Sequence, residues 1–275
     1  MSAQLVERSA EWAEATAPSG PLRLLLSRVA TLSLVELRKI RHDRSELYTR
    51  AVQPALWLLI FGETFTRIHA IPTTGGLPYL DYLAPGVMAQ SALFIAIFYG
   101  IQIIWERDFG ILTKLMVTPT PRAALVAGKV FAAGIRATSQ VVVVLALSAI
   151  LGVSFDWNPL HLLAAVLVVV VAAAFFSALS LTIAGLVLTR ERLMGIGQAI
   201  TMPLFFGSNA LYPASVMPAW IRWLTVVNPL TYEVGALRTL LLGTAGNLAV
   251  DAAALVTAAV VGIAVASALL GRLAR

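Results

Sequence analysis

The chain alternates between long apolar runs and short polar connections, and six of the apolar runs are long enough to cross a bilayer as helices. A spanning helix needs about 20 mostly apolar residues, because the hydrocarbon core is about 30 Å thick and a helix rises about 1.5 Å per residue. The pattern therefore predicts an all-α membrane protein with six transmembrane helices. The predicted helices are Leu47–Thr66, Tyr82–Ile104, Lys129–Leu151, Leu160–Leu188, Leu193–Leu211 and Leu248–Leu270.

The residues before the first span divide into two regions. Residues 1–20 are polar and rich in Ala and Glu, which indicates a flexible N-terminus. In residues 21–46, apolar positions recur near helical spacing and Arg and Lys supply a basic face, a pattern typical of an amphipathic helix that lies in the membrane interface. The predicted transmembrane domain covers residues 47–271, and residues 272–275 form a tail.

The stretch 213–241, between the last two predicted spans, is too interrupted for a spanning helix and too apolar for a solvated loop. Pro213, Pro218 and Pro229 break it into short pieces. We expect these pieces to be short re-entrant helices that dip into the outer leaflet, because non-helical backbone at that depth has to be buried by protein or reached by water.

The composition supports lipid as the main solvent of this chain. Hydrophobic residues make up 59% of it and charged residues only 12%, with a mean hydropathy of +0.85. Soluble domains usually carry about 25% charged residues. The chain contains no cysteine, which excludes disulfides, thiol catalysis and thiolate metal sites.

The basic residues indicate the orientation of the predicted spans. Lys and Arg are concentrated before the first span, between the second and third, between the fourth and fifth, and in the tail. The opposite side holds only Arg67, Arg222 and Arg238. By the positive-inside rule, we expect both termini of this multi-pass chain to be cytoplasmic. The bias toward Ala, Val, Leu and Arg suggests a bacterial source, so the expected location is the bacterial plasma membrane. No cleavable signal peptide is visible, so the first span would act as an uncleaved signal.

A charged, amphipathic segment at 105–118 separates the second and third spans and predicts a short cytoplasmic helix that ends before Pro119 and Pro121. The apolar residues that fall close to one face of that helix are Trp105, Phe109, Leu112, Leu115 and Met116. Such a helix either anchors the loop at the interface or lies in a groove of a soluble partner.

Two motifs resemble the signatures of ABC-2 type permeases. The first is Glu106-Arg-Asp-Phe-Gly-Ile-Leu-Thr-Lys-Leu-Met-Val-Thr-Pro119, followed by Arg122 and Gly128-Lys129. The second is Val227-Asn-Pro-Leu-Thr-Tyr-Glu-Val-Gly-Ala-Leu-Arg238, and a weaker third is Tyr82-Leu-Ala-Pro-Gly86. Asp108 and Ile111 depart from the Glu and Thr that are commoner in the family's pattern.

The resemblance is closest to the drug-resistance branch, typified by daunorubicin exporters, and it implies a half-transporter. Two such permeases, as a homodimer or a heterodimer, would pair with two copies of an ATP-binding-cassette subunit that binds ATP and Mg. The implied coupling residues are Glu106, Arg107, Phe109, Gly110, Leu112, Lys114 and Leu115. The implied residues of an outer gate are Asn228, Pro229, Tyr232, Glu233 and Arg238, of which Glu233 and Arg238 are candidates for an ion pair.

The chain itself has no nucleotide-binding loop of the form G-x-x-x-x-G-K-[ST]. Its one Gly-Lys pair, Gly128-Lys129, has Ala123 in place of the first glycine and Val130 in place of the hydroxyl residue. We therefore expect no catalytic residue and no cofactor on this chain, with Lys129 extending to the lipid headgroups. The three histidines are scattered, so we expect no metal site, and we expect membrane lipid and not nucleic acid as the partner of the basic residues.

The cargo is the least constrained part of the interpretation. Apolar spans and short outer connections favour an amphiphile such as a drug, an antibiotic or a lipid-like compound. Alternatives are a polysaccharide or lipo-oligosaccharide, or a secondary transporter driven by an ion gradient. The aromatic residues that are candidates for a substrate path are Phe94, Phe98, Phe205 and Phe206. Arg136 lies within the third span, where it either extends to the lipid headgroups or pairs with Asp43 or Glu46.

Overall fold

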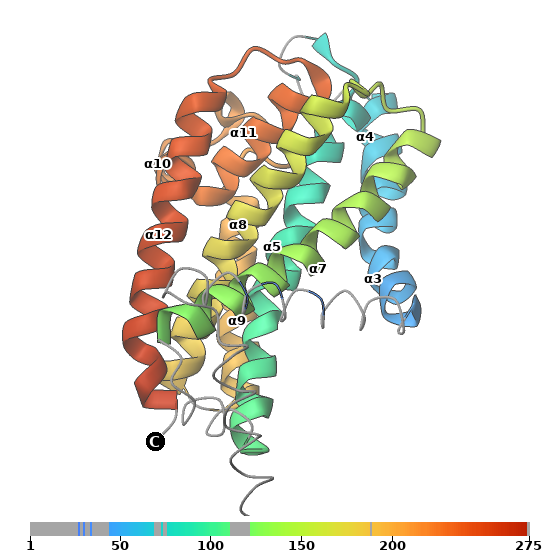
Figure 1. Cartoon of the computed structure of the whole chain (residues 1–275). Coiled ribbons are helices and arrows are strands. Elements are labelled where there is room, and N and C mark those ends of the chain that lie inside the picture. The colour runs from blue at the N-terminus through green and yellow to red at the C-terminus, as the bar shows by residue number, and fades with distance from the viewer. Residues whose placement is uncertain are drawn as a thin grey trace, which may run out of the picture.

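The computed structural model describes Ser27, Ala30, Leu34 and residues 44–68, 73, 76–110, 122–187 and 189–273. In these parts the regular structure is helical, and most of the helices stand side by side in an upright bundle (Figure 1). The four longest are α5 (Tyr79–Asp108), α7 (Arg122–Ile150), α8 (Pro159–Val187) and α12 (Leu248–Leu273). Each contains a stretch long and apolar enough to cross a membrane, which confirms four of the six predicted spans as candidates.

Helices α5, α8 and α12 begin at the end drawn at the top, whereas α7 runs in the opposite direction, so the connections lie at two opposite ends of the bundle (Figure 1). The connections 151–158 and 243–247 lie at the end drawn at the top, which we call the upper end. The final residues of α5 and α8 lie at the opposite, lower end. Helices α8 and α12 run in the same direction, and the chain returns to the upper end between them.

Helix α8 occupies the centre of the bundle and packs against α5, α7, α11 (Pro229–Leu242) and α12. Its close approach to α5 occurs where Gly100 faces Ser180, whose hydroxyl donates a hydrogen bond to the carbonyl of Ile97. A Cβ on Gly100 would overlap the Ser180 side chain. Small residues at such crossings let helix backbones approach closely in a lipid environment.

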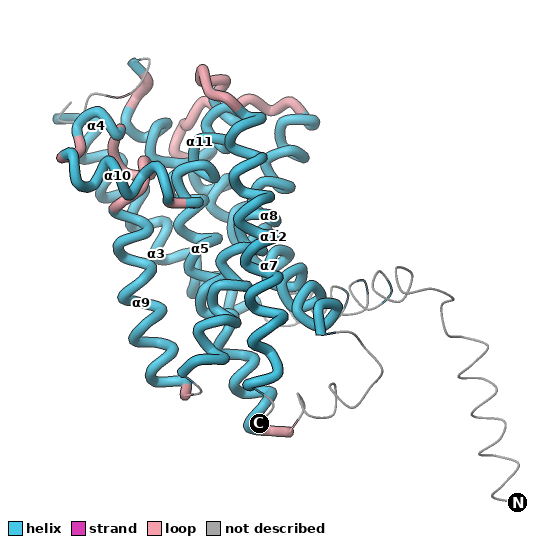
Figure 2. Tube along the Cα trace, turned by 90° about the vertical axis from the view of Figure 1, so that its left-hand side faces the viewer, coloured by secondary structure: helices cyan, strands magenta, loops and turns pink. Residues whose placement is uncertain are grey.

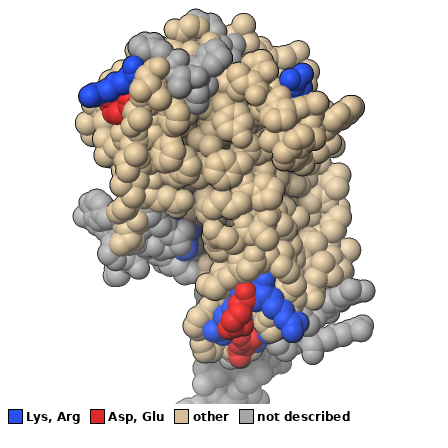
Figure 3. Space-filling model, turned by 180° about the vertical axis from the view of Figure 1, so that it is seen from behind, with Lys and Arg blue, Asp and Glu red and all other residues tan. Residues whose placement is uncertain are grey.

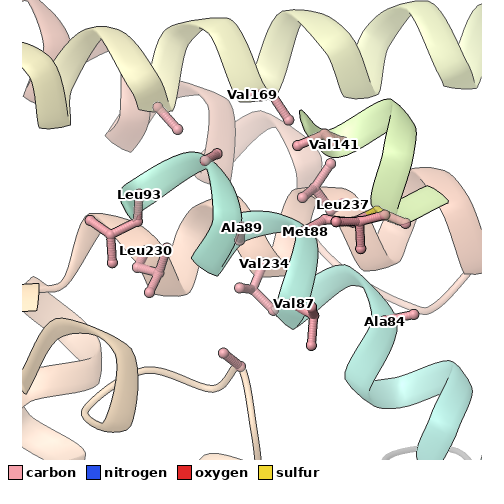
Figure 4. Close-up of a cluster of buried hydrophobic side chains, with 14 of the residues drawn as sticks. Ala84, Val87, Met88, Ala89, Leu93, Val141, Val169, Leu230, Val234 and Leu237 are labelled. Atoms are coloured by element: carbon pink, nitrogen blue, oxygen red, sulfur yellow. The ribbon is translucent and has the colours of Figure 1, made fainter. Parts of the chain in front are cut away.

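The upper half of the bundle contains a continuous core of aliphatic side chains (Figure 4). Met88 and its neighbours on α5 point between Leu237 of α11, Val141 of α7 and Val169 of α8. All four side chains are buried. This core holds α11 upright against the long helices, even though α11 is too short to cross a bilayer alone.

The first predicted span, Leu47–Thr66, is helical but is not one continuous α-helix. It falls within α3 (Arg44–Leu56), a π-helical stretch η1 (Trp57–Gly62) and α4 (Glu63–Ile68). Pro54 lies inside α3 and has no N–H to donate to the preceding turn. Proline and π-helical turns both interrupt regular α-helix geometry, and here they follow each other directly.

The fifth predicted span, Leu193–Leu211, extends too far at its C-terminal end. Helix α9 covers Arg190–Phe206, and residues 207–212 are bends and turns. Pro203 inside the last turn lacks a donor, and the carbonyl of Pro203 instead accepts a hydrogen bond from the amide of Gly207. Neither α9 nor the first helical region is among the four helices that meet the length and hydropathy expected of a span.

The predicted re-entrant region 213–241 consists of a short 3-10 turn η3 (Ala214–Val216), α10 (Ala219–Val227) and α11. Helix α10 lies across the direction of α9 near the upper end, whereas α11 stands upright in the bundle (Figure 2). Pro229 begins α11 and Gly243 ends it with a φ of 64°, a left-handed conformation that favours glycine.

The remaining predicted boundaries need smaller corrections. Helix α5 is longer than Tyr82–Ile104 at both ends, and α7 begins at Arg122, well before the predicted Lys129. Helices α8 and α12 agree closely with their predictions at the N-terminal end. The predicted flexible segment 1–20 and most of the predicted interfacial helix 21–46 lie outside the described residues.

Gly86 provides a direct test of the packing at the upper end. A Cβ at this position of α5 would lie 2.9 Å from the carbonyl carbon of Ala210 and closer still to its oxygen. We predict that Gly86→Ala lowers the unfolding temperature of the detergent-solubilised protein, with a loss of about 1–3 kcal/mol from overpacking. The matched change Gly195→Ala on α9, where no atom lies within 4 Å, is expected to leave stability unchanged or slightly raised. Equal stability of the two variants would contradict this packing.

Candidate functional site

The lower end of α5 is joined to α7 by a largely buried ion pair between Glu106 and Lys129. The side chain of Lys129 is 8% exposed and that of Glu106 is 17% exposed. The prediction that Lys129 extends to the headgroups is therefore wrong, because its ammonium group points to a carboxylate on the neighbouring helix. Removing one member of such a pair leaves a poorly solvated charge without a partner.

A second set of charged contacts joins the lower end of α5 to the start of α9. The carboxylate of Asp108 accepts hydrogen bonds from Arg107, at 2.8 Å, and from Arg190 of α9, at 2.7 Å. The Arg190 guanidinium also lies 3.6 Å from the ring centroid of Trp105, which stacks on Phe109. Figure 3 shows acidic and basic side chains gathered at this end, while the face between the two ends carries almost none. We call the contacts of Glu106 and Asp108 the lower ion-pair network.

The predicted coupling residues fall partly within this network. Glu106 and Arg107 lie in the last turn of α5, and Phe109 follows it with 66% of its surface exposed. Gly110 has a φ of 69°, so the helix ends there in a conformation that favours glycine. Residues 105–108 thus belong to α5 itself, and a separate coupling helix would begin after Gly110. The predicted coupling residues Leu112, Lys114 and Leu115 lie outside the described residues.

At the upper end, Arg238 of α11 binds backbone carbonyl groups from two other segments. Its guanidinium donates to the carbonyls of Tyr82 (3.0 Å), Asn209 (2.8 Å) and Ala210 (3.1 Å). It also lies 3.5 Å from the centroid of the Tyr82 ring. Arg238 is only 7% exposed. We call this arrangement the Arg238 site; it joins α11, the start of α5 and the non-helical connection after α9.

The two tyrosines at the start of α5 add to the same arrangement. The hydroxyl of Tyr82 donates to the carbonyl of Asn209 at 2.9 Å, and that of Tyr79 donates to the carbonyl of Leu211 at 3.0 Å. The motif Tyr82-Leu-Ala-Pro-Gly86, which gave the weakest resemblance in the sequence, therefore packs directly on the connection that Arg238 binds. The sequence resemblance alone did not indicate that these two motifs meet.

Asn228 has two structural roles that the sequence suggested only in part. Its side-chain oxygen accepts a hydrogen bond from the amide of Leu230, which caps the N-terminus of α11. Its side-chain nitrogen donates to the carbonyl of Leu204, at 2.6 Å, and to that of Gly207, at 3.3 Å. The last carbonyls of a helix have no partner within the helix, so Asn228 satisfies the C-terminal end of α9 while it starts α11.

The candidate pair of Glu233 with Arg238 does not form in the structure. Arg238 binds carbonyl groups instead, and Glu233 is fully buried with neither carboxylate oxygen hydrogen bonded to any part of the described chain. Tyr232 donates its hydroxyl to the carbonyl of Val226 at 2.6 Å. Pro229 is the first residue of α11. Of the five predicted gate residues, Asn228, Pro229 and Tyr232 thus stabilise the α10–α11 corner, whereas Arg238 binds α5 and the connection after α9.

A cavity of about 490 Å³ lies between α3, α5, α7 and α9. Phe94 and Phe98, both predicted for a substrate path, line it and stack with their ring centroids 6.2 Å apart. Its other lining residues include four glutamines, one from each of the four helices. These are Gln53, Gln90, Gln140 and Gln198. We call this space the glutamine-lined cavity.

Sequence reasoning missed these glutamines although the signal was present. Four of the six predicted spans each contain one of them, and polar side chains within apolar spans usually mark a functional interior. Gln90 and Gln140 are 3% and 2% exposed, whereas Gln53 and Gln198 are exposed at the rim of the cavity. The other two candidate path residues, Phe205 and Phe206, are not among the residues that line it.

Those two phenylalanines have different surroundings. Phe205 is buried and packs edge-on against Trp57 with a centroid distance of 5.5 Å. Phe206 is 43% exposed on the outside of the helix. The structure therefore places Phe94 and Phe98 at the cavity and Phe205 in the core.

A second cavity, of about 400 Å³, adjoins the first because both are lined by Ile95 and Phe98. It lies nearer the lower end of α5 and is also lined by Gln102, Trp105 and Arg136. The Arg136 guanidinium is 5.8 Å from the centroid of the Tyr99 ring. The proposed partner Asp43 lies outside the described residues, so the structure does not decide between the two interpretations of Arg136.

We predict that Arg238→Leu destabilises the protein, because the carbonyl of Ala210 loses its donor inside the bundle and that of Asn209 keeps only the Tyr82 hydroxyl. Each buried carbonyl left without a donor costs about 1–3 kcal/mol. The matched control is Arg222→Leu, since Arg222 is exposed and makes one hydrogen bond, to the carbonyl of Met217. Both variants are heated in detergent and assayed by size-exclusion chromatography. If the Arg238→Leu protein is as stable as the Arg222→Leu protein, the Arg238 site contributes little to the stability of the fold.

The sequence matches a family model and several characterised proteins. The model described as "ABC-2 type transporter" matches residues 28–242. A daunorubicin resistance ABC transporter permease protein of Streptomyces coeruleorubidus is 27% identical over 246 residues, which are 85% of this chain and 86% of that protein. A protein named as a probable doxorubicin resistance ABC transporter permease of Mycobacterium tuberculosis is 26% identical over 194 residues, 70% of this chain and 68% of that protein.

Transport permeases called ycf38 from Cyanophora paradoxa and Porphyra purpurea are each 26% identical, over 196 and 191 residues. These matches cover 70% and 68% of this chain, and the chain spans 67% and 64% of the length of those two proteins. The family model covers most of the chain, including the ion-pair network at the lower end of α5 and the Arg238 site. The chain is therefore a multi-pass membrane protein that belongs to the ABC-2 type transporter family.

Proposed function

We propose that this chain is the membrane subunit of an ATP-driven exporter that moves amphiphilic compounds out of a bacterial cell. The observation that carries the proposal is the position of the glutamine-lined cavity, which is lined by the candidate spans α5 and α7 together with α3 and α9 and lies above a charged segment of the ABC-2 signature. The similarity to daunorubicin and doxorubicin resistance permeases supports a drug-like cargo.

The proposed architecture is a dimer of permeases with two ATP-binding-cassette subunits at the lower end. Six crossings would result if the α3–α4 region and α9 both span the membrane, with α10 and α11 as an outer re-entrant element. Both termini are then cytoplasmic, and the upper end faces outward. The lower end carries the charged groups that a soluble subunit binds well, and the upper end carries the apolar α10 with exposed Trp220 and Trp223.

In the proposed mechanism, ATP binding closes the partner subunits and moves the segment 105–118 of this chain. The Glu106–Lys129 pair transmits that movement to α7, and the contact of Asp108 with Arg190 transmits it to α9. Both helices line the glutamine-lined cavity. The C-terminal end of α9 is bonded to Asn228, so its movement also reaches the α10–α11 corner. Movement at the lower end would thus change the cavity and the outer corner together.

An oligosaccharide or lipo-oligosaccharide is the second candidate for the cargo. One observation favours it: Phe94 and Phe98 form a stacked pair within a cavity that also carries amide groups. Aromatic faces with polar neighbours suit sugar rings as well as drug-like rings. Transport assays with both classes of cargo distinguish these candidates, and abolition of transport by a proton uncoupler at constant ATP would favour an ion-gradient-driven transporter instead.

We predict that Phe109→Ala and Leu112→Ala together weaken association with the ATP-binding-cassette subunit and abolish ATP-dependent transport in proteoliposomes. Phe109 is mostly exposed, so its loss is expected to change the partner contact more than the fold. Trp157→Ala at the upper end, where Trp157 is 56% exposed, is the control and is expected to leave pull-down and transport intact. Normal association and transport by the double alanine variant would rule out this contact.

The Glu106–Lys129 pair permits a charge-exchange test of transmission. Glu106→Lys alone places two ammonium groups together at a largely buried site. We therefore predict that it lowers the free energy of unfolding by about 3–5 kcal/mol and abolishes ATP-coupled transport. The double variant Glu106→Lys with Lys129→Glu restores opposite charges and is expected to recover both in large part. Glu191→Lys, an exposed acid at the same end, is the control. A double variant no better than the single one would argue against the pair as the link between α5 and α7.

A further inference from the structure

We propose that the glutamine-lined cavity binds an uncharged, hydrogen-bonding part of the cargo, namely a ring system that carries hydroxyl, carbonyl or amide groups. A cationic or anionic group is rejected from this cavity. This inference rests on the proposed export function and specifies its class of substrate.

The cavity lies at a depth where exposed amides are costly. Gln90 is 11 residues from the start of α5 at Tyr79, which corresponds to about 16 Å along the helix. That distance is about half of the 30 Å hydrocarbon core. Gln140 lies in the interior of α7 and lines the same cavity. Polar side chains at this depth typically face a functional interior and not lipid.

Gln90 is the strongest single indication of a ligand. It is 97% buried, since its exposed fraction is 3%, and it lines the cavity. Within the described ranges no hydrogen-bond partner of its amide is found. A buried amide without a partner is unfavourable, so a polar group of a ligand that binds it gains free energy that an apolar ligand does not gain.

Among the described residues of the lining, the polar ones are all uncharged. They are Thr49, Gln53, Gln90, Ser91, Gln140 and Gln198. An amide both donates and accepts, so this set satisfies hydroxyl, carbonyl and amide groups of either polarity. A charged group that enters the cavity loses part of its hydration and finds no counter-charge among the lining residues that the structure describes. The chemistry of the lining therefore selects against charge.

The apolar residues of the lining fit a flat ring system. Phe94 and Phe98 stack with an interplanar angle of 18°, so together they present a continuous aromatic wall. The volume of about 490 Å³ lies within the range of cavities that hold drug-sized ligands, about 300–1,000 Å³. A ring with polar substituents can thus contact the aromatic wall on one side and the amides on the other.

The competing explanation is structural, because glutamines also join helices by hydrogen bonds within membranes. In that case Gln90 and its neighbours would stabilise the bundle and bind nothing. The two explanations differ in what substitution does. If the glutamine is structural, its substitution lowers stability and does not change the preference among ligands. If it binds the ligand, its substitution changes which ligand binds best.

The test uses three dansyl probes that differ in charge: the neutral N-(2-hydroxyethyl) dansylamide, the cationic dansylcadaverine and the anionic dansylglycine. Each is titrated into the purified full-length permease in lipid nanodiscs, with empty nanodiscs subtracted, and dansyl fluorescence reports binding. We expect the dissociation constant of the neutral probe to be lower than that of either charged probe by about tenfold or more. Equal binding of all three, or tighter binding of a charged probe, overturns the proposal.

Variants assign the binding to this cavity. Gln90→Leu is expected to weaken the binding of the neutral probe by about tenfold. Gln90→Glu is expected to shift the preference toward the cationic probe, because it places a carboxyl group in the cavity. Gln198→Glu at the exposed rim repeats this charge test if the buried variant does not fold. The matched control is Gln102→Leu, on the same helix but in the adjoining cavity. If Gln102→Leu weakens binding of the neutral probe as much as Gln90→Leu does, the probe does not bind specifically in the glutamine-lined cavity.

Failure of this inference is distinguishable from failure of the proposed function. ATP-dependent transport and association with the ATP-binding-cassette subunit are measured on the same variants in proteoliposomes. If the cationic probe is transported in an ATP-dependent way and Gln90 variants do not change this transport, the proposed substrate class is wrong and the proposed export function is supported. Charge-selective binding without any ATP-dependent transport supports the cavity and overturns the exporter.

Discussion

Buried backbone carbonyls outside regular helices must find donors within the protein, because a lipid environment supplies none. In this chain the problem is concentrated after α9, where Pro203 and Gly207 end the helix and residues 207–212 continue without helical bonds. Arg238, Asn228 and the two tyrosines at the start of α5 supply the donors. These contacts fix the upper ends of α5, α9 and α11 relative to one another, and the position of the cavity below them depends on that arrangement.

Helix α5 connects all three functional features. Its first turn contacts the Arg238 site through Tyr82, its middle lines the glutamine-lined cavity through Gln90, and its last turn forms the lower ion-pair network through Glu106. Helix α9 parallels this arrangement, from Arg190 at the lower end through Gln198 to Leu204, which Asn228 binds. A displacement of either helix along its axis would therefore change the cavity and both of its ends at the same time.

Much of the architecture was predictable from the sequence because hydrophobic length has a direct physical meaning in a bilayer. The pattern predicted α8 and the start of α12 closely, since nothing within them competes with a continuous apolar helix. It was wrong where a local residue breaks the helix: Pro54 precedes a π-helical stretch, and Pro203 shortens α9. The Glu106–Lys129 pair and the contacts of Arg238 depend on which helices become neighbours, and spacing along one chain does not contain that information.

The candidate cavity shows the same limit. The aromatic residues Phe94 and Phe98 were predicted as candidates for a substrate path, and their spacing of four positions places them on one helical face. The four glutamines come from four different helices and converge only in the folded bundle. Their presence in apolar spans was a visible signal, but the place where they meet was not. Phe205 and Phe206 illustrate the converse, because an attractive aromatic pair in the sequence became one core residue and one exposed residue.

The central claim is that force enters at the lower end, from the cytoplasm, and cargo leaves at the upper end. Because the chain has no cysteine, single cysteines report the side of each end without background. Glu191→Cys marks the lower end and Ala245→Cys the upper end, and both positions are exposed. The account predicts that a membrane-impermeant maleimide labels the residue at 245 in intact cells and the one at 191 only after the membrane is opened. The reverse pattern would place the ion-pair network outside the cell and contradict the account.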